Sequence, residues 1–127
     1  MADKFAGKAA VISGGSTGMG LVTAKRFIQE GMDHVFITCW RKDALDRART
    51  EIGRNVAGVQ GDVANLSDLD RLYDEVKKNN GKTDVIFANA GVAQLAPFAD
   101  VDAKFYDLHF DANVKGCSSL CRKAFRS

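Results

Sequence analysis

The sequence has little net charge and no long hydrophobic run. Its formal net charge is +2, with acidic and basic residues interspersed, which argues against a nucleic-acid footprint and a membrane-surface protein. The longest apolar runs are about as long as a strand, so the sequence predicts no membrane span. The segment from Met1 to Phe5 has no apolar stretch suited to a signal peptide, and the cytoplasm is the expected compartment.

Cysteine and histidine are also scarce. Cys39, Cys117 and Cys121 form neither an even disulfide framework nor a C-x-x-C pair. Cys117 and Cys121 would share one helix face, but His34 and His109 lie elsewhere in the chain. We therefore expect reduced thiols and no metal site.

The composition is that of an ordinary globular domain, with 46% hydrophobic and 27% charged residues. Four short apolar runs are typical of strands buried on both faces of a parallel sheet, over residues 9–13, 34–38, 56–60 and 84–89. The amphipathic stretches between them predict helices over 21–30, 44–52 and 66–79, and a last one from about residue 102. The pattern predicts a single α/β domain over residues 1–127, with a Rossmann-like, doubly wound parallel sheet.

Capping residues stand at the ends of these predicted helices. Asp43 and Asn65 are placed to cap the second and third helices, and Gly31 and Gly53 to end the first two. The last helix is expected to begin near Asp102, with apolar side chains at three- and four-residue steps: Phe110, Val114, Cys117 and Cys121.

The most informative segment, from Ser13 to Gly20, lies directly between a predicted strand and a predicted helix. Gly14 would permit the tight turn, Gly18 would let backbone amides approach a pyrophosphate, and Gly20 would let the helix pack against the strand. The amides and the positive end of the helix dipole would then hold the anion. A glycine cluster alone also suits any turn, but this strand–turn–helix setting favours a dinucleotide.

This loop resembles the T-G-x-x-x-G-x-G signature of short-chain dehydrogenases/reductases, with Ser13 at the threonine. Three further segments are similar to motifs of that family at its spacing: Asp62-Val63, Asn89-Ala90-Gly91 and Asn113-Val114-Lys115-Gly116. The resemblance covers residues 7 to 116 and implies the strand order 3-2-1-4. It also implies an NAD(P)-dependent oxidoreductase that interconverts small-molecule alcohols and carbonyls.

The resemblance assigns roles to individual residues. Asn113 is implied to be a catalytic residue, the only member of the family's catalytic tetrad in the sequence. The residues implied to bind the dinucleotide are Ser13, Gly14, Ser16, Thr17, Gly18, Met19, Gly20, Arg41, Asp62, Val63, Asn89, Ala90 and Gly91. Simpler roles remain open: Asp62 could cap a turn, Asn89 could satisfy loop amides, and Asn113 could be an ordinary polar residue.

The end of the second predicted strand bears on which dinucleotide is bound. Members of the family that use NAD have an acid there, whereas this chain has Cys39, followed by Trp40 and Arg41. Without a carboxylate to repel a 2′-phosphate, and with Arg41 able to bind one, NADP is favoured over NAD. Cys39-Trp40 departs from the G-R-R often found in NADP-preferring relatives, and Trp40 could stack on adenine or lie at the surface.

The resemblance also implies a serine and a Y-x-x-x-K pair beyond the Asn113 helix, which the 127 residues do not include. Tyr73 and Lys77 have the Y-x-x-x-K spacing but precede Asn89, and Tyr73 belongs to an apolar stripe, so packing is the expected role. We expect the chain to be inactive alone. The alternative is a non-catalytic dinucleotide-binding or interaction module.

The tail over residues 117–127 departs from the apolar stretch that follows N-V-x-G in the family. When residues 117–127 are translated back into possible codons and these are read in a frame that starts at the third base of each codon, one permitted product is LLFTVQKGFPL. This sequence resembles a helix of the family. We therefore hypothesise a truncated chain whose tail results from loss of one base near codon 116. The alternative is a genuine half-domain, since the tail keeps helical spacing. Sequencing the coding DNA around and beyond codon 116 distinguishes the two.

The fourth predicted strand would lie at the edge of such a sheet. A long apolar edge invites pairing with another chain, so we expect a homodimer through this edge or through the last helix, as in the family. The segment from Val92 to Val101 would border the substrate site, but nothing in the sequence identifies the substrate.

Overall fold

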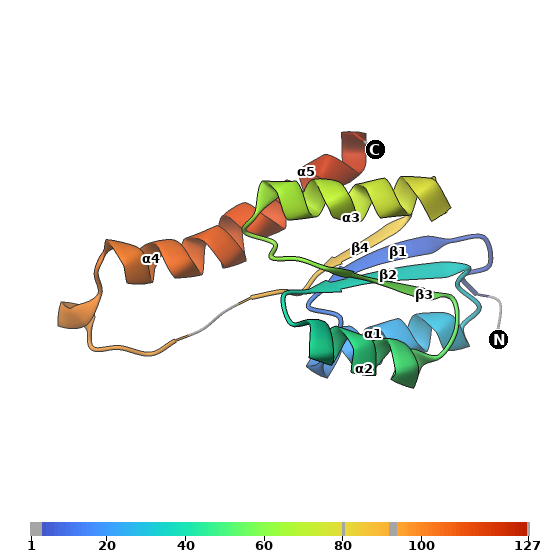
Figure 1. The fold of residues 1–127 in the computed structure, drawn as a ribbon, viewed down its shortest axis with the longest axis horizontal. Coiled ribbons are helices and arrows are strands. Elements are labelled where there is room, and N and C mark those ends of the chain that lie inside the picture. The colour runs from blue at the N-terminus through green and yellow to red at the C-terminus, as the bar shows by residue number, and fades with distance from the viewer. Residues whose placement is uncertain (1–3, 80, 92–93, 127) are drawn as a thin grey trace.

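The protein forms a four-stranded parallel sheet with helices on both faces. A computed structural model describes residues 4–79, 81–91 and 94–126. The strands are β1 (Ala9–Ser13), β2 (His34–Cys39), β3 (Val56–Gln60) and β4 (Val85–Ala88). They pair in parallel in the order β3-β2-β1-β4, which confirms the predicted fold class and strand order (Figure 1).

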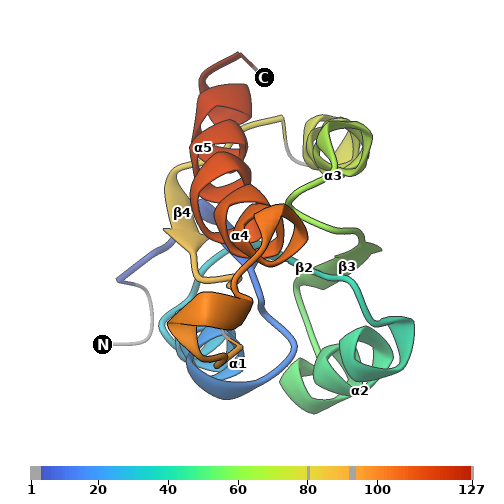
Figure 2. The same ribbon diagram turned by 90° about the vertical axis from the view of Figure 1, so that its left-hand side faces the viewer.

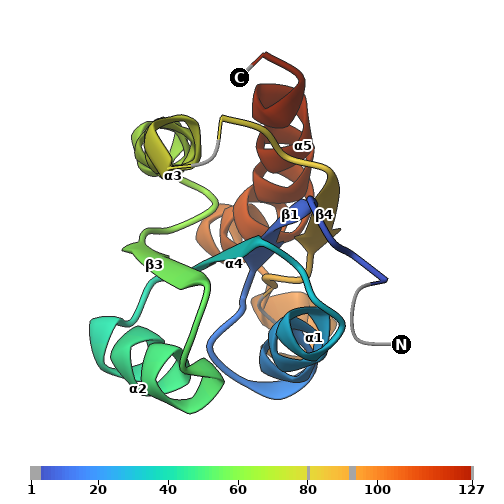
Figure 3. The same cartoon turned by 90° about the vertical axis from the view of Figure 1, so that its right-hand side faces the viewer.

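The helices cover the sheet in two layers. α1 (Gly18–Gln29) and α2 (Lys42–Ile52) lie on one face, and α3 (Leu66–Asn79) and α5 (Cys117–Arg126) on the other (Figures 2 and 3). A 3-10 turn (Phe98–Asp100) and α4 (Ala103–Phe110) project away from the sheet, and a π-helical turn (Asp111–Gly116) joins α4 to α5. No helix in the described residues is long and apolar enough to cross a membrane.

Each face of the sheet has its own hydrophobic core, because side chains alternate along a strand. Ala10 and Ile12 of β1 pack toward the α1/α2 layer, whereas Val11 packs toward the α3/α5 layer. All five residues of β1 are buried, as expected for a central parallel strand. The four apolar runs are therefore strands, as predicted.

Most of the predicted helix ends are confirmed. Asn65 Oδ1 accepts a hydrogen bond from the amide of Asp68 (3.2 Å), and Asp102 Oδ1 accepts one from the amide of Phe105 (2.8 Å). Gly31 and Gly53 follow α1 and α2 with φ of +88° and +90°, a conformation that favours glycine.

Two predicted helix starts were wrong. α1 begins at Gly18 rather than Leu21, so the end of the glycine loop is already helical. α2 begins at Lys42 with Arg41 at the N-cap, so Asp43 lies in the first turn and is not the N-cap residue. Its carboxylate instead accepts a hydrogen bond from Arg41 Nη2 at 3.0 Å.

The prediction that the apolar stripe of the last helix forms its buried face is also wrong. Phe110 and Val114 are 46% and 54% exposed, whereas Ala112 and Leu120 are buried. On an uninterrupted α-helix residues 112 and 120 would lie about 80° apart around the axis, at about 100° per residue. The π turn holds one extra residue and brings them within about 20°. It therefore aligns Ala112 with Leu120 toward the body of the protein.

The segment from Cys117 onward packs as a helix against α3. Leu120 is fully buried, and Tyr73 Oη donates a hydrogen bond to the Leu120 carbonyl oxygen at 2.8 Å. Burial raises the pKa of the Tyr73 hydroxyl far above its usual range, with the neighbouring Cys121 a smaller cause. Lys123 Nζ lies 2.5 Å from Asp70 Oδ1. Tyr73 thus has a packing role, as predicted.

Candidate functional site

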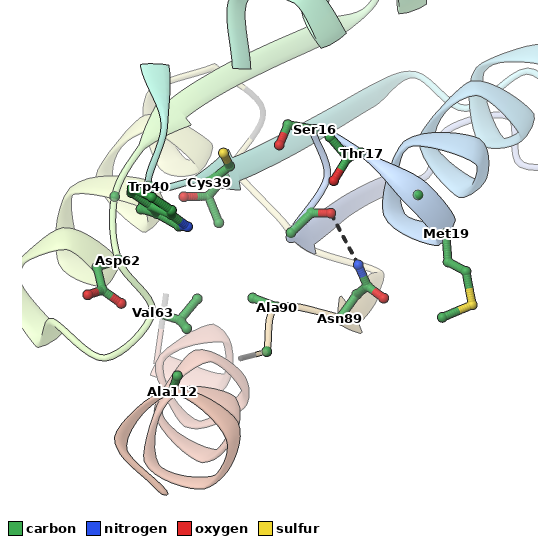
Figure 4. Close-up of a pocket in the computed structure, with 15 residues that line it drawn as sticks. Ser16, Thr17, Met19, Cys39, Trp40, Asp62, Val63, Asn89, Ala90 and Ala112 are labelled. Atoms are coloured by element: carbon green, nitrogen blue, oxygen red, sulfur yellow. Dashed lines mark hydrogen bonds between the residues drawn. The ribbon is translucent and has the colours of Figure 1, made fainter. Parts of the chain in front are cut away.

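A cavity of about 370 Å³ opens at the carboxyl ends of the strands. This is the edge of a parallel sheet at which ligands bind in doubly wound folds. Figure 4 shows the residues that line the cavity. They are Gly14, Ser16, Thr17, Gly18, Met19, Thr38, Cys39, Trp40, Gly61, Asp62, Val63, Asn89, Ala90, Gly91 and Ala112.

The glycine loop forms one wall and is closely packed. The amide of Gly14 donates to the Thr38 carbonyl oxygen at 2.9 Å, which ties the turn to β2. Gly14 has φ of +68°, and a Cβ on Gly20 would lie 2.2 Å from the Gly14 carbonyl oxygen. Gly20 therefore brings α1 against the turn, as the loop pattern predicted.

The N-terminus of α1 faces the cavity through Gly18 and Met19. The first amides of an α-helix have no partner within the helix, and the helix dipole makes this end positive. Thr17 stands at the N-cap, but its side chain makes no capping hydrogen bond. Gly18 has φ of +57°, and nothing within 4 Å would meet a Cβ there. The arrangement can accept an anionic group.

Side chains hold the end of β4 against this loop. Ser13 Oγ accepts hydrogen bonds from the amides of Asn89 and Ala90, both at 3.1 Å. Asn89 Nδ2 donates to the Gly14 carbonyl oxygen at 3.1 Å, the dashed line in Figure 4. Ser13 is 2% exposed and lies behind the cavity rather than in its lining. Asn89 satisfies loop groups and also lines the cavity.

The end of β2 forms the opposite wall. The Gly61 amide donates to the Cys39 carbonyl oxygen (2.9 Å), and Gln60 Nε2 donates to that of Trp40 (3.1 Å). The Trp40 ring lines the cavity beside Cys39 (Figure 4), although Trp40 is 69% exposed. An exposed aromatic ring in such a wall offers a flat apolar surface to a planar ligand.

Arg41 lies just outside the lining. Its guanidinium carbon is 6.0 Å from the centroid of the Trp40 ring, and its Nη2 is 3.0 Å from Asp43 Oδ2. The hydrogen bond from Arg41 holds the pKa of the Asp43 carboxyl below its usual value. The guanidinium is thus at the rim of the cavity and already paired.

Asp62 and Val63 form the floor below Trp40 (Figure 4). Asp62 Oδ1 accepts a hydrogen bond from the Ala64 amide at 2.9 Å, so the aspartate caps a turn and lines the cavity at once. Val63 is buried, and a Cβ on Gly116 would lie 2.8 Å from its Cγ2. The glycine lets the π turn approach this floor.

Asn113 lies on the π turn next to the motif that ends β4. A Cβ on Gly91 would be 2.9 Å from Asn113 Oδ1, so the two motifs are in contact. Asn113 itself is exposed, and Ala112 rather than Asn113 lines the cavity. The residues Val92 and Ala93, expected at the border of a substrate site, lie outside the described residues.

Ten predicted site residues line the cavity together, drawn from the glycine loop, the segment after β3 and the end of β4. Four predicted residues do not line it: Ser13, Gly20, Arg41 and Asn113. The lining also includes five residues outside the predicted binding set: Thr38, Cys39, Trp40, Gly61 and Ala112. The sequence indicates these residues only through their position, because each of them adjoins the end of a strand or a predicted motif. Of the two positions left open for Trp40, stacking on the base or the surface, its place in the lining is compatible with stacking.

Cysteines and other metal ligands form no cluster in the described part of the chain. Cys39, Cys117 and Cys121 are free thiols. Among the described residues no group of three or more His, Cys, Asp or Glu side chains could hold a metal ion.

Comparisons with known proteins match nearly the whole chain. The sequence model of a family described as short chain dehydrogenase matches residues 8–127. Oxidoreductase asL5 from Sarocladium schorii is 45% identical over 113 residues, which are 89% of this chain and 45% of the relative. Glucose 1-dehydrogenase from Gluconobacter oxydans is 32% identical over 128 residues, 98% of this chain and 48% of the relative.

Solved structures agree with the fold. A short-chain dehydrogenase/reductase of the glucose/ribitol dehydrogenase type from Brucella melitensis has a TM-score of 0.92 at 23% identity, over 99% of this chain and 52% of that one. A short chain dehydrogenase from Bacillus anthracis has a TM-score of 0.87 at 28% identity, over 92% of this chain and 49% of that one. The chain spans about half the length of the curated relatives it matches.

Proposed function

The chain belongs to the short-chain dehydrogenase family, and we propose that it binds NADP or NAD in the cavity at the carboxyl end of its sheet. Within the whole protein, this binding serves an oxidoreductase that interconverts alcohols and carbonyls. The observation that carries the proposal is the convergence of three distant segments on one cavity beside the N-terminus of α1.

The residues present fit a dinucleotide. Gly14 and Gly18 have positive φ, and a Cβ on Gly20 would meet backbone, so the loop keeps its amides close to the cavity. The volume of about 370 Å³ lies within the range of small-molecule sites. The site combines amides for phosphate with an apolar wall for a base.

Each group has a proposed task. The amides of Gly18 and Met19 hold the pyrophosphate at the N-terminus of α1. Trp40 and Val63 enclose the adenine, while the Asp62 carboxylate, fixed by the Ala64 amide, is placed to accept from its exocyclic amine. Ala90 and Gly91 let the nicotinamide half pass along the end of β4.

The dinucleotide, when bound, supplies hydride transfer. The chain's own contribution is to hold it, and Asn113, which lies outside the lining but against Gly91, is the proposed catalytic residue. A proton must also move to or from the substrate oxygen. The resemblance implies a Ser, Tyr and Lys for that step beyond Asn113. We therefore expect residues 1–127 alone to bind the dinucleotide without turnover.

We propose NADP as the preferred form. The supporting observations are the absence of an acid at Cys39, where β2 ends, and the position of Arg41 at the rim. A bidentate guanidinium suits a 2′-phosphate. The pairing of Arg41 with Asp43 acts against this preference.

The test is direct titration of the 127-residue protein. Trp40 is the single tryptophan of the chain, so its fluorescence should change on binding of NADP or NAD. Calorimetry with each dinucleotide gives the affinities, and carbonyl-dependent oxidation of NADPH tests turnover. Binding without turnover is the expected result. Failure to bind either dinucleotide at millimolar concentration would overturn the proposal.

We also propose that the chain associates with a second copy. β4 lies at the edge of the described sheet, and α4 with the π turn exposes Tyr106, Leu108, Phe110 and Val114. Tyr106 and Phe110 stack on one side of α4, and exposed apolar side chains that gather in this way are typical of an interaction surface.

A further inference from the structure

The arginine expected to meet a 2′-phosphate is held by a carboxylate of the same chain. Arg41 Nη2 lies 3.0 Å from Asp43 Oδ2, and Arg47 Nη2 lies 4.0 Å from the same oxygen. Asp43 therefore sits between two guanidinium groups in the first turn of α2. Any phosphate that binds Arg41 must share it with, or take it from, this carboxylate.

The pair is exposed enough to exchange partners. The side chains of Arg41 and Asp43 are 51% and 66% exposed, and exposed ion pairs are weak and screened by salt. Arg41 also adjoins the Trp40 ring, which lines the cavity. A dinucleotide whose base lies on Trp40 would bring its ribose close to this pair.

We propose that Asp43 is a specificity-determining residue that lowers the affinity for NADP relative to NAD. Its carboxylate competes with the 2′-phosphate for Arg41 and repels it directly, whereas the 2′-hydroxyl of NAD is neutral. The inference rests on the proposed function, because it concerns the preference of the same site.

The competition persists at neutral pH. Arg41 holds the pKa of the Asp43 carboxyl below its usual value, so this group stays ionised well below neutrality. The 2′-phosphate carries about 1.5 to 2 negative charges near pH 7. Two anions then compete for one guanidinium.

Substitution of Asp43 by Asn tests the proposal. The amide keeps the shape of the side chain but removes the charge, and Arg41 and Arg47 become available to a phosphate. We expect Asp43→Asn to tighten NADP binding by no more than about fivefold, because exposed ion pairs are weak and screened by solvent. NAD binding should change less than about twofold, and the NADP gain should shrink in high salt.

Asp46→Asn is the matched control. Asp46 lies in the same helix and carries the same charge, but it pairs with Lys42 (3.5 Å) and Arg49 (4.0 Å) rather than Arg41. It should leave NADP affinity unchanged. In an Arg41→Gln background, Asp43→Asn should give no gain, because the shared partner is gone. Circular dichroism and urea unfolding check that each variant folds.

The outcomes separate the inference from the proposed function. If wild-type protein binds a dinucleotide but Asp43→Asn does not favour NADP, the inference is overturned and the proposed function stands. The inference is also overturned if Asp43→Asn raises the affinity for NAD as much as that for NADP, or if Asp46→Asn raises NADP affinity equally. Either result would mean that the loss of any negative charge in α2 has the same effect. If wild type and variants bind neither dinucleotide, the proposed function itself fails.

Discussion

Gly18 and Gly20 stand two residues apart in one loop, yet the structure makes different demands on them. A Cβ on Gly20 would lie 2.2 Å from the Gly14 carbonyl oxygen and 2.8 Å from Asn89 Nδ2, and the first is a backbone atom of the turn. A Cβ on Gly18 would meet nothing within 4 Å, although its φ of +57° strains other residues. One position is limited by space and the other by backbone conformation.

Alanine substitution should separate these two constraints. We expect Gly20→Ala to lower the free energy of unfolding by about 3 kcal/mol, because the turn must open, and to abolish dinucleotide binding. Gly18→Ala should cost only about 1 kcal/mol of conformational strain. Urea unfolding measures both. Equal losses in the two variants would show that the loop is not packed as described.

Asp84 gives a residue-scale prediction about pH. Its Oδ2 accepts a hydrogen bond from the Ala9 amide at 2.9 Å and lies 3.4 Å from Lys82 Nζ. The bond from Ala9 is the main reason that the pKa of Asp84 falls below its usual value. A lowered pKa in the folded state means that ionised Asp84 stabilises the protein above the unfolded pKa of about 3.9.

The stabilisation by Asp84 should therefore disappear in acid. We expect Asp84→Asn to be less stable than wild type at pH 7 and to converge with it as the pH falls below about 4. Both curves come from urea unfolding across pH 7 to 3. A difference that persists unchanged at pH 3 would contradict the role of the charge.

At the level of elements, α5 depends on one buried side chain. Leu120 is fully buried among residues of α3 and the sheet, and Tyr73 donates a hydrogen bond to its carbonyl oxygen. We expect Leu120→Ala to lower the free energy of unfolding by about 2–5 kcal/mol. Tyr73→Phe, which keeps the ring, should cost about 1 kcal/mol. Denaturant unfolding provides both values.

A small loss for Leu120→Ala, below that of Tyr73→Phe, would mean that α5 does not dock on α3 in solution. The frameshift origin of residues 117–127 stays a separate prediction. Packing of α5 says how the tail folds and nothing about how it arose.

The elements differ in how far the sequence could predict them. The four strands could be located because runs such as Ala9–Ser13 are apolar on both faces and bounded by turn residues. The π turn could not be located from the sequence, because the spacing of apolar residues does not indicate where a helix contains one extra residue. For this reason the sequence pattern places Phe110 and Val114 on the predicted buried face. The face that packs has Ala112 and Gly116, which carry little hydrophobic signal.

The site was predictable to a similar extent. The positions of the glycines and the order of the motifs predicted the residues whose backbone shapes the cavity. Whether Trp40 faces the cavity or the surface stayed open in the sequence, because the path of the chain after β2 is not encoded by spacing; in the structure Trp40 lines the cavity. The pairing of Arg41 with Asp43 depends on rotamers of two exposed side chains, and no periodicity encodes these.

At the scale of the whole molecule, the exposed apolar residues of α4 and the π turn support association of two copies. Tyr106 and Phe110 stack on each other at 4.3 Å between ring centroids and are 54% and 46% exposed. Their burial against a second copy would remove a large apolar area from water. We expect a homodimer by light scattering at tens of micromolar.

Charge on this face should oppose the dimer. Phe110→Glu should shift the protein toward monomer without unfolding it, because the side chain is exposed in one copy. Val22→Glu on α1, 66% exposed, is the control and should leave the dimer intact. A wild-type monomer at these concentrations would refute the proposal. If neither variant dissociates the dimer, the edge of β4 becomes the expected interface.

The π turn also determines where this helix can change length. It holds one residue more than the α-helical turn it replaces, so a deletion within Asp111–Gly116 can be absorbed by a return to α-helix. A deletion within α4 would instead leave the π turn in place and rotate Ala103 and its neighbours by about 100° relative to α5. Natural insertions and deletions among relatives should therefore concentrate at this turn, where a lineage can gain or lose a residue while Leu120 keeps its place.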